Sequence, residues 1–80
     1  MPTPTKIAAI GSMTTAIKAQ RALAAADLSA HVVSLSPSDS KKGCAYGVEF
    51  RSELEGAVRH VLRSAHITVT EILQKGGAPL

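Results

Sequence analysis

The stretch from Cys44 to Leu73 reads CAYGVEFRSELEGAVRHVLRSAHITVTEIL and decides the fold of the chain. Its centre predicts an amphipathic helix, because apolar residues recur at the spacing of a single helix face: Leu54, Ala57, Val58, Val61, Leu62 and Ala65. Ser52, followed three residues later by Glu55, has the pattern of a capping box at the start of that helix. Alternating residues on either side predict one strand over 44–50 and another over 67–73.

The alternation also predicts which side chains share a face of each strand. In the first strand, Cys44, Tyr46, Val48 and Phe50 fall on one face and Ala45, Gly47 and Glu49 on the other. In the last strand, Ile67, Val69 and Leu73 alternate with Thr68, Thr70 and Ile72.

The first half of the chain predicts the same kind of unit. A short apolar run over Lys6–Ile10 ends at Gly11 and indicates a buried strand. Ser12 can cap a helix over 13–26, whose expected apolar face is Met13, Ala16, Ile17, Leu23 and Ala24. Ala30–Leu35 alternates like a strand, and Ser36–Gly43 is rich in turn formers and is expected to be a loop.

The resulting order, β-α-β-β-α-β, predicts the ferredoxin-like α+β arrangement, with two helices on one face of a four-stranded antiparallel sheet. Right-handed crossovers place the first and third strands in the centre. We expect Gly11 and the loop before the third strand to lie at opposite ends of this sheet. The single domain is expected over residues 6–73, between flexible termini at 1–5 and 74–80.

Composition bounds the function of this 80-residue chain. Its single cysteine rules out an intramolecular disulfide and a cysteine-based metal cluster, and it suits a reducing cytoplasm. The histidines, His31, His60 and His66, are not spaced like metal ligands, so neither a metal nor a cofactor is expected. We expect no secretory leader, and no apolar run is long enough for a bilayer. Tyr46 and Phe50 are the only aromatic rings, and a second copy could cover one sheet face, which leaves a homodimer open.

Nucleic-acid binding is not expected, although the fold class includes RNA-binding domains. Lys42-Gly43-Cys44-Ala45-Tyr46 begins like their third-strand signature, but Cys44 replaces the first stacking ring. The first strand has no aromatic residue at all, so the platform on which bases stack is missing.

Cys44 is the one obvious reactive group. Thiolate is the nucleophilic form of cysteine, and the ammonium groups of Lys41 and Lys42 favour it over the thiol. Gly43 gives the backbone freedom for another molecule to approach the sulfur. The other interpretation is that Cys44 is a small buried apolar residue, aligned with Tyr46 on the face toward the helices.

The chain resembles the putative selenium/sulfur carrier-like family over about Lys6–Leu73. The most specific part of the resemblance is PSDSKKGCAY at 37–46, with a lone cysteine at the start of the third strand. Cys44 carries over as the functional position, while Pro37 and Gly43 match as residues that shape the loop. Ala45 stands where the family often has glycine. Ser38 replaces a common basic residue, whose charge Lys41 or Lys42 could supply.

The resemblance implies a carrier protein rather than an enzyme that turns over. The thiolate of Cys44 would accept a sulfur or selenium atom from a cysteine desulfurase-like donor and pass it to an acceptor enzyme. Two alternatives stay open. One is a non-catalytic regulatory or interaction module that uses the sheet face, and the other is a thiol redox sensor in which Cys44 pairs between chains.

Overall fold

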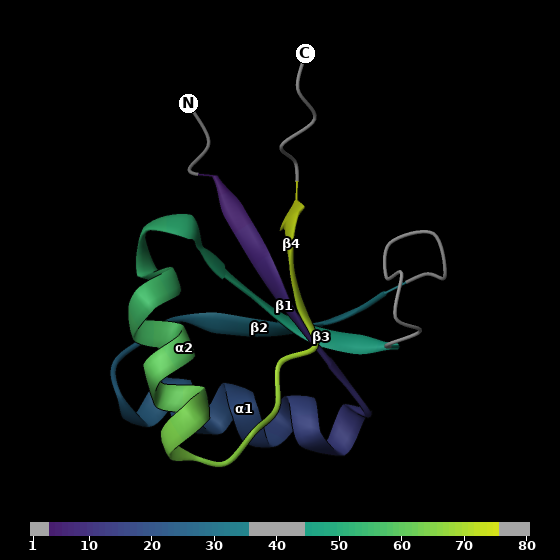
Figure 1. Ribbon diagram of the computed structural model, residues 1–80, viewed down its shortest axis with the longest axis horizontal. Helices are drawn as coiled ribbons and strands as arrows, with labels where there is room; N and C mark the ends of the chain where they lie inside the picture. The colour runs from purple at the N-terminus through teal and green to yellow at the C-terminus, as the bar shows by residue number, and fades with distance from the viewer. Residues whose placement is uncertain (1–3, 36–44, 76–80) are drawn as a thin grey trace.

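The computed structural model describes residues 4–35 and 45–75. Figure 1 shows the elements in chain order: β1 (Thr5–Gly11), α1 (Met13–Ala25), β2 (Ala30–Ser34), β3 (Tyr46–Arg51), the short 3₁₀ helix η1 (Ser52–Leu54), α2 (Glu55–Ser64) and β4 (Glu71–Lys75). The neighbouring strands β1 and β4 pair from Thr5 opposite Lys75, so the sheet extends slightly beyond the predicted strand bounds. Within the described ranges, no helix is long and apolar enough to cross a membrane.

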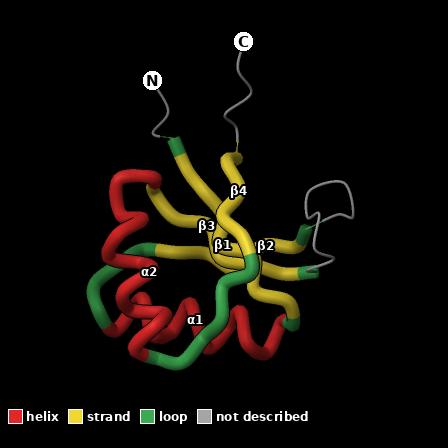
Figure 2. Tube along the Cα trace, in the orientation of Figure 1, coloured by secondary structure: helices red, strands yellow, loops and turns green. Residues whose placement is uncertain are grey.

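The strands form one antiparallel sheet in the order β2-β3-β1-β4, with both helices on the same face (Figure 2). The predicted ferredoxin-like topology is therefore confirmed, including the central positions of the first and third strands. Each crossover carries one helix, which gives the two β-α-β halves that the sequence pattern predicts.

The core lies between the sheet and the two helices. Its largest fully buried side chains are Leu23 of α1, Val48 of β3, and Val58 and Leu62 of α2. Phe50 is buried beside them, so the predicted inner face of the third strand is confirmed for its two apolar members. On α2 the predicted stripe is right at its centre, but Ala57 and Ala65 at its margins are exposed.

The predicted apolar face of the first helix is only partly right. Ala16 and Leu23 are buried, and so is Ala19, which the pattern missed. Met13 and Ile17 remain 48% and 38% exposed, and Ala24 is exposed as well. The helix is rotated so that alanines contact the sheet, and small side chains allow a close approach of the two backbones.

The capping box predicted for the second helix is wrong. Ser52 begins η1 instead, and its buried hydroxyl oxygen has no hydrogen-bond partner among the described residues. The Glu55 carboxylate pairs with Lys6 of β1 and with Arg59, whose guanidinium lies 2.8 Å away. A hydrogen bond from Lys6 has the largest effect and one from Arg59 the next largest, and together they hold the pKa of Glu55 below its ordinary value. The ion pairs with these two cations have replaced the reciprocal bonds of the cap.

The last strand begins at Glu71, four residues later than predicted. Residues 67–70 form the crossing from α2 to the sheet, where Ile67 is buried and Thr70 donates from both its backbone nitrogen and its hydroxyl to the Ala9 carbonyl. Ile72 pairs with Ala8 in register and packs against the core.

Candidate functional site

The candidate site residues, Pro37, Lys41, Lys42, Gly43 and Cys44, all lie outside the described residues. The structure does describe the residues on both sides of them. The Leu35 backbone nitrogen donates to the Ala45 carbonyl oxygen at 2.7 Å, and Ser34 pairs with Tyr46. Cys44 is therefore joined by one peptide bond to a residue that this hydrogen bond fixes at the end of the sheet.

The β1–α1 turn lies at the same end of the sheet. Gly11 pairs with Tyr46, because β1 and β3 are antiparallel and the last residue of one must lie beside the first residue of the other. The expectation that Gly11 and the loop before the third strand lie at opposite ends is therefore wrong. The direction of the two neighbouring strands was sufficient to predict the correct arrangement.

The start of α1 is well defined at this end. Gly11 adopts a φ of +129°, which favours glycine. Ser12 is the helix cap, as predicted, and its hydroxyl oxygen accepts a hydrogen bond of 3.2 Å from the Thr15 backbone nitrogen. The turn therefore lies directly beside Tyr46. Tyr46 follows Cys44 by two residues in the chain.

Gly47 is required by the close approach of β1 to β3. A β-bulge lies between Ala9 and Gly11, opposite the start of β3. A Cβ atom on Gly47 would lie 2.5 Å from the Ala8 carbonyl oxygen, closer than van der Waals contact allows. This glycine fixes the spacing of the two central strands next to the Cys44 end.

We expect Gly47→Ala to destabilise the protein by about 1–3 kcal/mol, because the added methyl group forces the β1 backbone to move. Gly56→Ala is the matched control, since a Cβ atom there meets nothing within 4 Å. In a helix such as α2 that change should stabilise by about 0.5–1 kcal/mol. Urea unfolding followed by circular dichroism measures both, and equal effects of the two changes would contradict the close approach at Gly47.

The remaining candidate groups do not form a site. His31, His60 and His66 are all exposed and come from different places in the fold. Among residues 4–35 and 45–75, no group of histidine, cysteine and carboxylate side chains could hold a metal ion.

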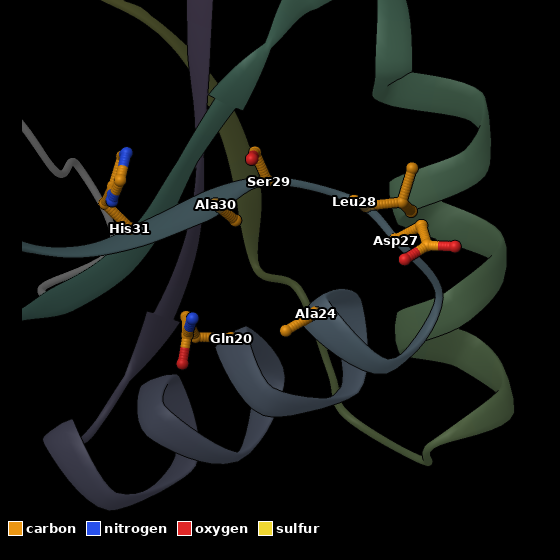
Figure 3. A pocket seen from close by; sticks show the side chains of 7 residues that line it. All are labelled: Gln20, Ala24, Asp27, Leu28, Ser29, Ala30 and His31. Atoms are coloured by element: carbon orange, nitrogen blue, oxygen red, sulfur yellow. The ribbon is translucent and has the colours of Figure 1, made fainter.

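A hollow of about 380 Å³, which was not predicted from the sequence, lies between the end of α1 and the beginning of β2. Gln20 and Ala24 point toward it from the helix, and Ala30 and His31 belong to the strand beside it (Figure 3). No residue pattern in the sequence indicates it, because it forms where the end of α1 and the beginning of β2 come together in the fold.

Comparison with known proteins gives one family match. The model of the family described as "Putative Se/S carrier protein-like" matches residues 5–74, which is nearly the whole chain and includes Cys44. None of the curated proteins and none of the solved structures compared with the chain gives a match.

Proposed function

Since the chain belongs to the putative Se/S carrier protein-like family, we propose that it carries a sulfur or selenium atom on Cys44. In the sulfur reaction, the Cys44 thiolate attacks the outer sulfur of a donor persulfide. A new S–S bond forms on Cys44 as the donor S–S bond breaks, and the donor leaves as a thiolate. The transferred sulfur keeps its oxidation state, so neither a metal nor a redox cofactor is needed.

The observation that carries this proposal is the position of the only cysteine, directly before Ala45, an exposed residue just ahead of the start of β3. Along the inner face of that strand, Phe50 and Val48 are fully enclosed, while Tyr46 is only partly buried. Burial thus decreases toward the Cys44 end. This trend favours an accessible thiol over the alternative in which Cys44 belongs to the core.

The neighbouring residues have roles that suit this chemistry. In the proposal, Lys41 and Lys42 favour the thiolate by their charge, and Gly43 lets a second protein approach the sulfur. Pro37 shapes the other end of the same loop. A cysteine desulfurase-like enzyme is the proposed donor and a second enzyme the acceptor, in the reducing cytoplasm where a lone thiol stays unpaired.

The accessibility of the thiol can be measured with iodoacetamide on the folded protein. We expect Cys44 to be alkylated within about tenfold of the rate of the urea-unfolded chain, because only an accessible and partly ionised thiol reacts. Alkylation only after unfolding would place Cys44 in the core and overturn the carrier proposal. A non-reducing gel run in parallel shows whether mild oxidant instead links two chains, as a redox sensor requires.

A further inference from the structure

A second hollow, of about 230 Å³, lies between α2 and the stretch of chain that crosses from this helix to β4 (Figure 1). Leu62 and Ile67 line it and are almost completely buried, and Val69 packs against the same core from the crossing. The remaining lining residues are Arg59 and Arg63 of α2, both exposed. This α2–β4 hollow therefore has an apolar floor and a cationic rim.

The fold does not neutralise the positive charge of this rim. No acidic side chain of the described residues lines the hollow. The Arg59 guanidinium lies 2.8 Å from the Glu55 carboxylate, but that carboxylate also pairs with Lys6, so the three groups together keep one positive charge. Arg63 has no ion-pair partner within the described part of the chain. A ligand at the rim therefore meets an excess of two positive charges.

The two arginines are placed to bind the same ligand. They are four residues apart on α2, so their Cβ atoms lie about 5–6 Å apart on one side of the helix. Glu55 precedes Arg59 by one more turn and accepts a hydrogen bond of 2.8 Å from its Nε, which orients that guanidinium. Guanidinium groups bind carboxylates through paired N–H donors, so the rim suits an acidic ligand.

Size and charge decide which acidic ligand fits. The volume of about 230 Å³ is below the roughly 300–1,000 Å³ of usual small-molecule sites and suits a single large apolar side chain. A nucleic acid would place phosphates on the arginines but nothing on the apolar floor. A second copy docked through the same face would bring four arginines together. An acidic protein segment with one apolar side chain matches both the rim and the floor.

The hollow also lies toward the end of the sheet from which the Cys44 loop begins. Val69 is followed by Thr70, which donates from its backbone nitrogen and its hydroxyl to the Ala9 carbonyl. Ala9 pairs with Gly47, the second residue of β3. A protein bound at Val69 therefore contacts the end of the domain at which β3 starts, two residues after Cys44.

We propose that the α2–β4 hollow receives a large apolar side chain, flanked by carboxylates, from the cysteine desulfurase-like donor that loads Cys44. The side chain packs on Leu62 and Val69, and the carboxylates pair with Arg59 and Arg63. This inference rests on the carrier function proposed above, and it assigns recognition of the donor to residues outside the loop that contains Cys44.

The test compares two sulfur donors. One is a cysteine desulfurase of the same organism supplied with L-cysteine, and the other is sodium tetrasulfide, which is too small to need docking. We expect Arg63→Glu to lower the second-order rate of loading from the desulfurase by about tenfold and to leave the rate with tetrasulfide unchanged. Arg21→Glu is the matched control, because it makes the same charge change at an exposed arginine of α1 that does not line the hollow. It should leave both rates within about twofold.

Two further measurements separate the rim from the floor. Added salt should slow loading of the unchanged protein by the desulfurase and have less effect on Arg63→Glu, because salt screens exposed charges. Val69→Thr keeps the shape of the side chain but places a hydroxyl on the apolar floor, and it should slow loading from the desulfurase alone by about threefold. Circular dichroism confirms that each variant is folded.

Each outcome has a distinct meaning. Failure of tetrasulfide to load the unchanged protein overturns the carrier function itself. If tetrasulfide loads it, the docking site alone is overturned by normal loading of Arg63→Glu from the desulfurase, by equal slowing in Arg21→Glu, or by a desulfurase that does not load the unchanged protein. A dimer that Arg63→Glu dissociates in analytical ultracentrifugation would assign the hollow to a second copy. Nucleic acid that elutes with the unchanged protein but not with Arg63→Glu would assign it to nucleic acid.

Discussion

Cys44→Ser should abolish sulfur loading completely. After incubation with a cysteine desulfurase and L-cysteine, the unchanged protein should gain about 32 Da, the mass of one sulfur atom, as expected for a persulfide. The variant should gain nothing, because a serine hydroxyl is not ionised at neutral pH and is a poor nucleophile toward sulfur. Intact-mass spectrometry under non-reducing conditions measures both proteins in one experiment.

The serine variant is a close structural match, because it replaces only the sulfur atom by oxygen. Dithiothreitol provides the second control, since it should remove the added mass from the unchanged protein by thiol exchange. The same mass gain on Cys44→Ser would show that sulfur is held elsewhere, and the role of Cys44 would be wrong.

Leu62→Ala should have the largest effect on stability. Leu62 is 1% exposed and packs in the core between α2 and the sheet. Removing its buried methyl groups should cost about 2–5 kcal/mol, because the lost burial and the remaining cavity both destabilise the fold. At about 4–8 °C for each kcal/mol in a domain of this size, the melting temperature should fall by roughly 10 °C or more.

Ile17→Ala is the matched control for this change. It also shortens an aliphatic side chain on a helix, but Ile17 is 38% exposed and outside the buried cluster. We expect it to cost about 1 kcal/mol or less, as for most surface substitutions. Thermal unfolding followed by circular dichroism would contradict the description of the core if Ile17→Ala destabilised the protein as much as Leu62→Ala.

The sequence predicts the fold well where hydrophobic periodicity and burial agree. Val58 and Leu62 stand at the centre of a strong helical stripe, and both are buried. Val48 and Phe50 alternate in β3 and both face the core. Such positions are predictable because a side chain that large and apolar has one favourable environment.

The errors arise where hydrophobicity alone ranks the residues. Met13 and Ile17 are more apolar than Ala19, but Ala19 is buried in the core and the two larger side chains remain exposed. Ser52 and Glu55 match a local capping pattern, but Lys6, which is 49 residues from Glu55 in the chain, provides the carboxylate with a stronger partner. Neither result can be read from neighbouring residues, because each depends on which strands the topology brings together.

At the candidate site, too, the chemistry follows from the sequence, whereas the position of the neighbouring elements follows from the topology. The chemistry of Cys44 is a prediction from residue type and family resemblance, and Cys44 itself lies outside the described ranges. The structure adds the position of its neighbours. The Leu35 backbone nitrogen donates a hydrogen bond to the Ala45 carbonyl oxygen, and Tyr46 pairs with Gly11 across the sheet. Gly11, just before α1, therefore lies at the same end of the sheet as Leu35 and Ala45, whereas the sequence pattern was interpreted as placing it at the opposite end.

The most direct test of the carrier function is whether sulfur loaded on Cys44 can be delivered to another nucleophile. The loaded protein is separated from the desulfurase and treated with cyanide, which takes the outer sulfur as thiocyanate and leaves the Cys44 thiolate. We predict one thiocyanate for each loaded chain and return of the chain to its original mass. Loaded protein that releases no thiocyanate, or that yields only a disulfide-linked dimer, would contradict the central claim.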